Sequence, residues 1–256
     1  MEETRNIALR ISFDGTRYHG WQVQRNDVSV AGTLESALSR LCGHTVKAHG
    51  CGRTDAGVHA ERYCVNFRTS SNIPIDRLPL AINSLLPRDI AVQSAVCASE
   101  GFDSNLSCIK KEYTYRIYSS RVRDPFYINR ALFYPKKLDV GAMRAAAAFY
   151  VGTHDFAAMR SAGAVTKTTV RTVHWYEIEE KGLIVELRVC ANGFLYNMAR
   201  AMAGTLLYVS EGKIAPDELP GLLKRGDRRL SGPTVPPGGL YLTRLWYEGA
   251  VGKMFE

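Results

Sequence analysis

The chain has 256 residues, of which 46% are hydrophobic and 23% are charged, as in globular proteins with a real core. No stretch of about 18 consecutive apolar residues occurs, which excludes a predicted transmembrane helix. The 33 Lys and Arg residues exceed the 25 Asp and Glu residues, giving a net charge of +8 and a pI near 9.2. This balance suits a polyanionic partner such as a nucleic acid.

The N-terminus and the cysteines indicate a reducing compartment. Met1 to Asn6 lead directly into a strand pattern without an apolar secretory segment, so we expect a cytoplasmic protein. The cysteines form no C-x-x-C pair and the six histidines show no ligand spacing. We therefore expect no disulfide framework, no metal site, and thiols, including that of Cys51, that pack as small apolar groups.

The first elements in chain order are a strand, a turn and an aromatic loop. Residues 7–13 alternate apolar and polar side chains, which predicts a strand with one buried face, and residues 14–17 predict a turn. The aromatic and polar segment 18–24 suits either a loop over a nucleotide or an irregular core flap. Thr33 is expected to cap a helix, and residues 45–49 to form a short strand.

The stretch Gly52-Arg53-Thr54-Asp55-Ala56-Gly57-Val58-His59-Ala60 follows. Two glycines bracket Arg53 and Asp55, and their spacing would aim both side chains at the same point. A guanidinium beside a carboxylate favours the ionised form, which suits nucleophilic attack better than proton donation. The alternative is an ordinary polar turn with a surface ion pair.

The rest of the chain predicts an α+β fold with a largely antiparallel sheet. Expected strands are residues 63–68, 90–98, 111–119, 169–179, 183–191 and 240–247, and expected helices are residues 74–86, 139–151, 193–210 and a short one from Pro216. The second half repeats the order of predicted strands and helices of the first half, without visible sequence identity between them. We expect a boundary near residues 101–110, with an N-terminal half of 1–105 and a C-terminal half of 106–256.

Two further positions could carry chemistry. Tyr113 shares a strand face with Tyr115 and Ile117, and such tyrosines either pack or reach a site. Arg200 lies on a helix face next to the apolar stripe that begins at Phe194, where an arginine is either solvated or functional.

Several blocks in order resemble the tRNA pseudouridine synthase A family. The stretch Gly52 to His59 is similar to its active-site signature, in which the Asp is catalytic. Less specific similarities are Asp14-Gly15 to Gln22, Lys111 to Ile117 and Asn192 to Arg200, and the weakest are Gly152 to Phe156 and Gly239 to Leu242. Together they cover nearly the whole chain.

The resemblance implies a fold, a reaction and roles for residues. It implies the pseudouridine synthase fold, with two pseudo-repeated α/β sandwich halves, a shared sheet and a cleft between them. It implies isomerisation of uridine in tRNA at positions 38–40 of the anticodon stem-loop, without a cofactor, by a homodimer. Asp55 would be the nucleophile, Arg53 and Arg200 its cationic neighbours, and Tyr113 a ring against the flipped-out uracil.

The chain departs from the family pattern at two positions, and two rival functions are open. Asn105 and Ala201 stand where the family usually has Arg and Asn, which affects RNA docking and target choice. A non-catalytic RNA-binding protein would keep the basic surface and tolerate Asp55→Ala. A nucleotide-binding enzyme is disfavoured, because the chain contains no G-x-x-x-x-G-K-[ST] or G-x-G-x-x-G pattern.

Overall fold

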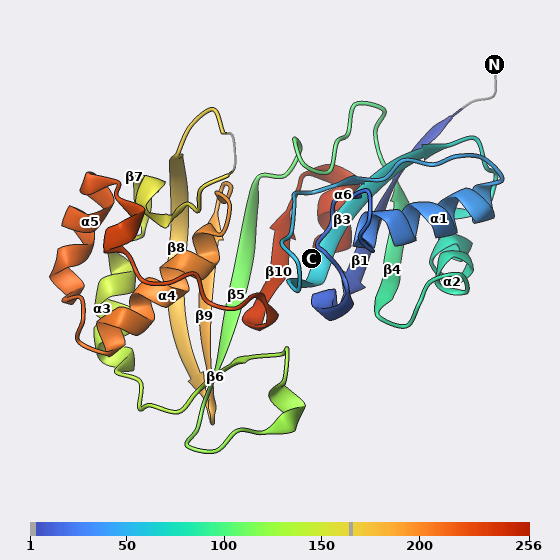
Figure 1. Cartoon of the computed structure of the whole chain (residues 1–256). Helices are drawn as coiled ribbons and strands as arrows, with labels where there is room; N and C mark the ends of the chain where they lie inside the picture. Colours follow the sequence, from blue (N-terminus) through green and yellow to red (C-terminus); the bar gives the residue numbers. More distant parts are fainter. Residues whose placement is uncertain (1–3, 164–165) are drawn as a thin grey trace. The chain divides into compact units, whose positions relative to one another are not determined.

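The computed structural model describes residues 4–163 and 166–256, which divide into two compact units (Figure 1). The first unit contains the chain up to Ile109 together with Tyr241–Glu256, and the second contains Lys110–Leu240. Each unit combines helices with mostly antiparallel strands, which confirms the predicted α+β class. Within the described ranges, no helix is long and apolar enough to cross a membrane.

The sheet of the first unit has the order β4-β1-β3-β10, with β2 paired to β3. Its strands are β1 (Arg5–Phe13), β2 (His49–Gly50), β3 (His59–Thr69), β4 (Ile90–Cys97) and β10 (Leu240–Trp246). β1 pairs antiparallel with β3 and β4, whereas β10 pairs parallel with β3. Both faces of β1 are covered, because helix α6 (Gly249–Phe255) packs on the face of Arg10, whose guanidinium donates to Met254 O at 2.9 Å. Ala8 on that face is therefore fully buried.

The helices of the first unit differ from the prediction at their ends. Helix α1 (Val30–Cys42) is capped by Ser29, whose Oγ accepts the Gly32 N–H at 3.2 Å. The prediction that Thr33 caps this helix is wrong, since Thr33 lies inside its first turn. The helix predicted over residues 74–86 is shorter, with a 3-10 turn followed by α2 (Leu78–Asn83). At its end, the Asn83 side chain exchanges two hydrogen bonds with the backbone of Val92 in β4.

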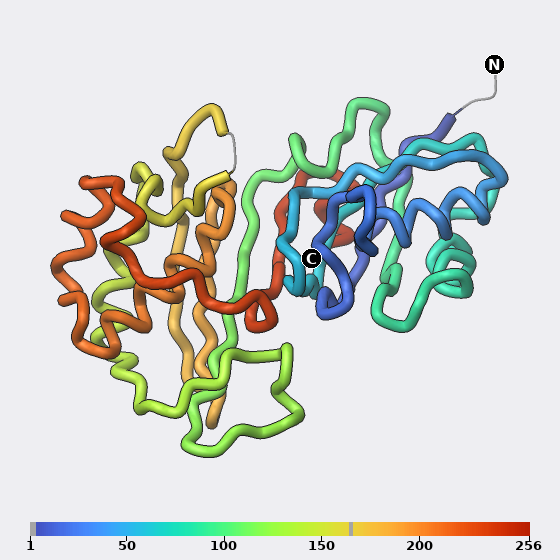
Figure 2. Tube along the Cα trace, viewed as in Figure 1, coloured from blue at the N-terminus to red at the C-terminus, as the bar shows by residue number. Residues whose placement is uncertain are grey.

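The sheet of the second unit has the order β5-β9-β8-β7, all antiparallel neighbours, with β6 parallel to β5. Its strands are β5 (Lys110–Ser119), β6 (Leu132–Tyr134), β7 (Gly152–Asp155), β8 (Val170–Lys181) and β9 (Ile184–Ala191), and its helices are α3 (Val140–Ala148), α4 (Met198–Ser210) and α5 (Leu219–Arg225). Helices α3 and α4 pack against each other and cover one face of this sheet (Figure 1). The segment 231–239 then runs across α4 (Figure 2).

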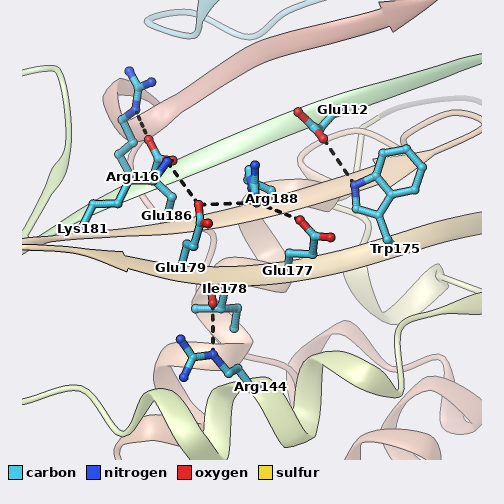
Figure 3. A network of polar contacts seen from close by, with 10 residues as sticks. All are labelled: Glu112, Arg116, Arg144, Trp175, Glu177, Ile178, Glu179, Lys181, Glu186 and Arg188. Carbon is cyan, nitrogen blue, oxygen red and sulfur yellow. Dashed lines mark hydrogen bonds and ion pairs between the residues drawn. The ribbon is translucent and has the colours of Figure 1, made fainter.

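The opposite face of this sheet carries a network of paired charges (Figure 3). Glu186 receives hydrogen bonds from Arg116 at 3.1 Å and from Lys181 at 2.7 Å, and Arg188 lies 2.8 Å from Glu177. Burial opposes ionisation of Glu186, but the two cationic donors outweigh it and lower the pKa of its carboxyl. These three cations are therefore paired with carboxylates of the same sheet.

Candidate active site

The loop between β2 and β3 presents Asp55 on a tight turn. The Asp55 carbonyl accepts the Val58 N–H at 3.2 Å, and Gly57 has a φ of +77°. A type II turn requires this left-handed conformation at its third residue, and glycine adopts it without steric cost. The start of the loop is also fixed, because the Tyr63 hydroxyl donates to Gly52 O. Gly57 thus supplies the left-handed conformation of the turn, and Tyr63 fixes the backbone of the loop at Gly52.

The segment from Gly15 to Trp21 wraps around this loop. Gly57 N–H donates to Tyr18 O at 3.2 Å, and Trp21 N–H donates to Thr54 O at 3.3 Å. The side chains of Tyr18 and Trp21 are only 3% and 6% exposed. The structure shows Tyr18 and Trp21 packed as a core flap that braces the loop of Asp55, whereas residues 22–24 are exposed.

Gly20→Ala tests this brace. Gly20 has a φ of +80°, and a Cβ there would lie 2.1 Å from Thr54 O, which cannot move without moving the loop. We expect the substitution to lower the free energy of unfolding by about 2–4 kcal/mol, from overpacking and the left-handed backbone together. Gly43 is a matched control, because it has a φ of +75° but open space around its Cβ.

Urea unfolding of both variants measures the difference. Gly43→Ala is expected to lower the free energy of unfolding by about 1–2 kcal/mol, from the left-handed backbone alone. Equal losses for Gly20→Ala and Gly43→Ala would show that close approach of the brace to the loop does not matter for stability.

His59 anchors the far end of the loop, a role that sequence reasoning missed. Its side chain is almost fully buried, its Nδ1 accepts the Gly15 N–H at 3.1 Å, and the Asp14 carboxylate lies 3.1 Å from the same nitrogen. The ring stacks on Tyr241 of β10, with centroids 4.7 Å apart. The pairing of Gly15 with His59 is a contact between segments 44 residues apart, so spacing within the motif gave no signal for it.

Arg53 does not form the ion pair with Asp55 that its spacing in the sequence suggested. Its side chain is exposed, and it forms no hydrogen bond or ion pair with any described residue. The predicted ion pair with Asp55 is therefore wrong for this structure. The reason is local, because Arg53 lies before the turn and its side chain lines a hollow beside the loop. Asp55 itself is half-buried, and it does interact with other residues.

In the second unit, Tyr113 and Tyr115 lie on the helix-covered face of β5. The half-buried ring of Tyr113 meets Phe194 edge-on, with centroids 4.9 Å apart. Tyr115 is buried and donates its hydroxyl to Pro236 O at 2.9 Å. Burial raises the pKa of Tyr115, and the charge of Arg200 partly offsets that rise. The structure thus places Arg200 on the same face as both tyrosines.

Arg200 is held at the start of α4 rather than solvated. Its Nε donates to Val235 O at 2.7 Å, and one terminal nitrogen donates to Asn197 Oδ1 at 2.8 Å. The segment that contains Val235 can approach because Gly204 and Gly232 lack side chains, since a Cβ on Gly204 would lie 1.8 Å from a backbone oxygen. The helix face of Arg200 and Gly204 therefore contacts the Pro-Gly-rich segment rather than water.

Asn197 positions Arg200 and explains why the predicted helix 193–210 begins only at Met198. Asn197 adopts a φ of +61°, which breaks the helix, and its Nδ2 donates to Ser161 Oγ at 2.9 Å. A non-glycine residue in the left-handed region is uncommon, and Asn tolerates it better than most. The signal in the sequence was the Asn-Gly pair followed by a second Asn, which is typical of turns.

Comparing Asn197→Ala with Asn197→Gly separates the contribution of the strained backbone of this residue to stability from that of its side-chain amide. Both variants lose the hydrogen bonds to Arg200 and Ser161, but only alanine is strained at positive φ. We expect Asn197→Ala to have a free energy of unfolding about 1–2 kcal/mol below that of Asn197→Gly, measured in urea. Equal stability of the two would contradict the strained-turn account of the helix start.

No group of three or more His, Cys, Asp or Glu side chains in the described ranges is arranged to hold a metal ion. The half-buried carboxylate of Asp55 on its braced turn is the candidate catalytic group of the first unit, and the anchored Arg200 is the candidate functional cation of the second.

Comparison with known proteins identifies the family. A family model described as tRNA pseudouridine synthase matches residues 10–103 and 146–248. Relatives named tRNA pseudouridine synthase A from Caldicellulosiruptor bescii, Geotalea uraniireducens and Thermoanaerobacter sp. are 44%, 42% and 41% identical over 243 residues, covering 95% of this chain and 100% of each relative. The chain belongs to the tRNA pseudouridine synthase family.

A solved archaeal box H/ACA sRNP Nop10-Cbf5 complex aligns with a TM-score of 0.35 and 13% identity, covering 79% of this chain and 43% of that one.

Proposed function

We propose that the protein isomerises uridine to pseudouridine in tRNA, at positions 38–40 of the anticodon stem-loop, with Asp55 as the nucleophile. The observation that carries the proposal is the braced turn of Asp55, within a chain that is similar over 95% of its length to tRNA pseudouridine synthases A. Because backbone hydrogen bonds fix the turn of Asp55, its position is set before any RNA binds, and such preorganisation favours catalysis.

The atoms balance without a cofactor. The bond between C1′ and N1 of uridine breaks, the detached uracil turns, a bond forms between C5 and C1′, and the C5 proton is lost while N1 gains one. Nothing is oxidised or hydrolysed, so the reaction calls for no nicotinamide, nucleotide or metal. The Asp55 carboxylate assists cleavage of the C1′–N1 bond, and the uridine must leave its stack to reach it, at a cost of a few kcal/mol.

The other residues serve the same step in this proposal. Arg200 holds the Asp55 carboxylate ionised, since a nearby cation lowers the pKa of a carboxyl. The ring of Tyr113, fixed edge-on by Phe194, packs against the extruded uracil. Arg53, which has no partner among the described residues, contacts the RNA. The net charge of +8 supplies the general attraction to the phosphate backbone.

Mapping the product tests the assignment of the target. Unmodified tRNA carrying uridine at positions 38, 39 and 40 is incubated with the protein, treated with a carbodiimide that stays on pseudouridine, and read by primer extension. New stops at those positions are expected. Stops confined to another arm of the tRNA would overturn the anticodon stem-loop assignment while leaving the reaction itself intact.

We also propose that the protein is a cytoplasmic homodimer. The location follows from the tRNA substrate, and fractionation checks it. Light scattering that gives the 28.4 kDa mass of one subunit would contradict the dimer.

A further inference from the structure

A hollow of about 490 Å³ lies in the first unit beside the loop of Asp55. Its volume is within the range of small-molecule sites, about 300–1,000 Å³. Six of its lining residues carry polar groups that could bind a ligand: Trp21, Gln22, Lys47, His49, Arg53 and Asn105. We call it the Trp21 hollow. Of its lining residues, only Arg53 has a role in the function proposed above.

The acidic side chains at the wall of the Trp21 hollow are already satisfied by the protein. Glu35 accepts the Ala48 N–H at 3.0 Å and pairs with Lys47 at 3.1 Å. The Asp103 carboxylate accepts two backbone N–H groups of the turn that follows it, both at 2.8 Å. These carboxylates therefore do not repel an anionic ligand as strongly as unpaired ones would.

Three donor side chains of the Trp21 hollow, in contrast, have no acceptor among the described residues. The indole N–H of Trp21 donates to no acceptor among the described residues, and its nitrogen stays accessible to solvent although the residue as a whole is only 6% exposed. The ring cannot turn elsewhere, because it packs on Tyr63 with centroids 4.5 Å apart and a Cβ on Gly50 would lie 2.5 Å from it. Gln22 and Arg53 are exposed and likewise have no partner within the described ranges. All three residues line the hollow, so a ligand bound there can supply acceptor oxygens for them.

We propose that the Trp21 hollow binds the nucleotide next to the target uridine in the same RNA strand. This inference rests on the proposed function. Arg53 takes the phosphate, while the Trp21 indole and the Gln22 amide donate to oxygens of the sugar and base. Arg53 precedes Asp55 by two residues, which span at most about 7 Å of chain. A strand that delivers its uracil to Asp55 therefore passes within reach of the Arg53 side chain.

Binding and kinetics of three variants test this site. Trp21→Phe removes the indole N–H and keeps an aromatic ring, and Gln22→Ala removes an exposed amide. We expect each to raise the Kd for an anticodon stem-loop RNA, and the KM, by about three- to tenfold with kcat within twofold, as for loss of one hydrogen bond. Arg40→Ala is the control, since Arg40 is exposed and unpartnered in the described chain and lines a different hollow of the same unit. It should change Kd less than twofold.

Photo-crosslinking supplies a second measurement in case Trp21→Phe weakens the fold. RNA with 4-thiouridine directly 5′ or 3′ of the target is irradiated with the wild-type protein, and adducts on peptides that contain residues 21–22 or 47–53 are expected. Normal Kd for Gln22→Ala together with adducts only on other peptides would overturn the Trp21 hollow as an RNA site. Pseudouridine formation by the wild type in the same samples separates that failure from failure of the proposed function.

Discussion

Asp55→Asn is expected to lower the rate of pseudouridine formation by about 10⁴-fold or more, as for loss of a nucleophile. The amide has nearly the same shape as the carboxylate, and the turn uses only the backbone carbonyl of residue 55 and the φ of Gly57. The fold and the RNA affinity should therefore stay close to wild type, so that the loss falls on kcat. Single-turnover rates with tRNA measure it.

The matched control for this variant is Asp76→Asn. Asp76 is exposed and has no hydrogen bond or ion pair with described residues, so its change of charge is the same without the chemistry. Its rate should equal that of wild type. A rate for Asp55→Asn within tenfold of that control would contradict the role of Asp55 as nucleophile.

Arg200→Met is expected to lower kcat by about 10²- to 10³-fold, the size of effect seen when a fixed electrostatic group of an active site is removed. Methionine replaces the aliphatic stem of the arginine but lacks the charge and the donors to Val235 O and Asn197 Oδ1. Without a neighbouring cation, the pKa of a carboxyl beside it rises, and the ionised fraction falls at lower pH.

Arg200→Lys separates the effect of the positive charge at residue 200 on kcat from the effect of the guanidinium geometry. It keeps the charge but loses the planar fork that reaches two acceptors, so its kcat should lie between those of wild type and Arg200→Met. The kcat of Arg200→Met should also recover partly as the pH rises, because a raised carboxyl pKa is overcome at higher pH. A flat pH profile with wild-type kcat would reject Arg200 as the cation that serves Asp55.

Strands were predictable from sequence because their signal is local. The alternation in residues 111–119 and 183–191 is the pattern of one covered face, and β5 and β9 fall there. Helix ends were harder, since they depend on side-chain contacts. Ser29 rather than Thr33 caps α1, and the left-handed Asn197 delays α4 to Met198.

The site was predictable in part for the same reason. The turn at Asp55 follows from two glycines in the motif, and the resemblance pointed to Tyr113 and Arg200. The brace at Gly20, the anchor at His59 and the contact of residues 233–235 with Gly204 depend on approach of distant segments. Spacing alone also suggested an ion pair between Arg53 and Asp55 that the structure does not form.

Tritium release tests the central claim most directly. tRNA labelled with tritium at uridine C5 is incubated with the wild-type protein, and label released to water is counted. Because the new C–C bond forms at C5, isomerisation must expel that tritium, and we expect release that stops at the number of target uridines per tRNA. No release from several unmodified tRNAs that the protein binds tightly would contradict the reaction, and would favour a protein that binds RNA without changing it.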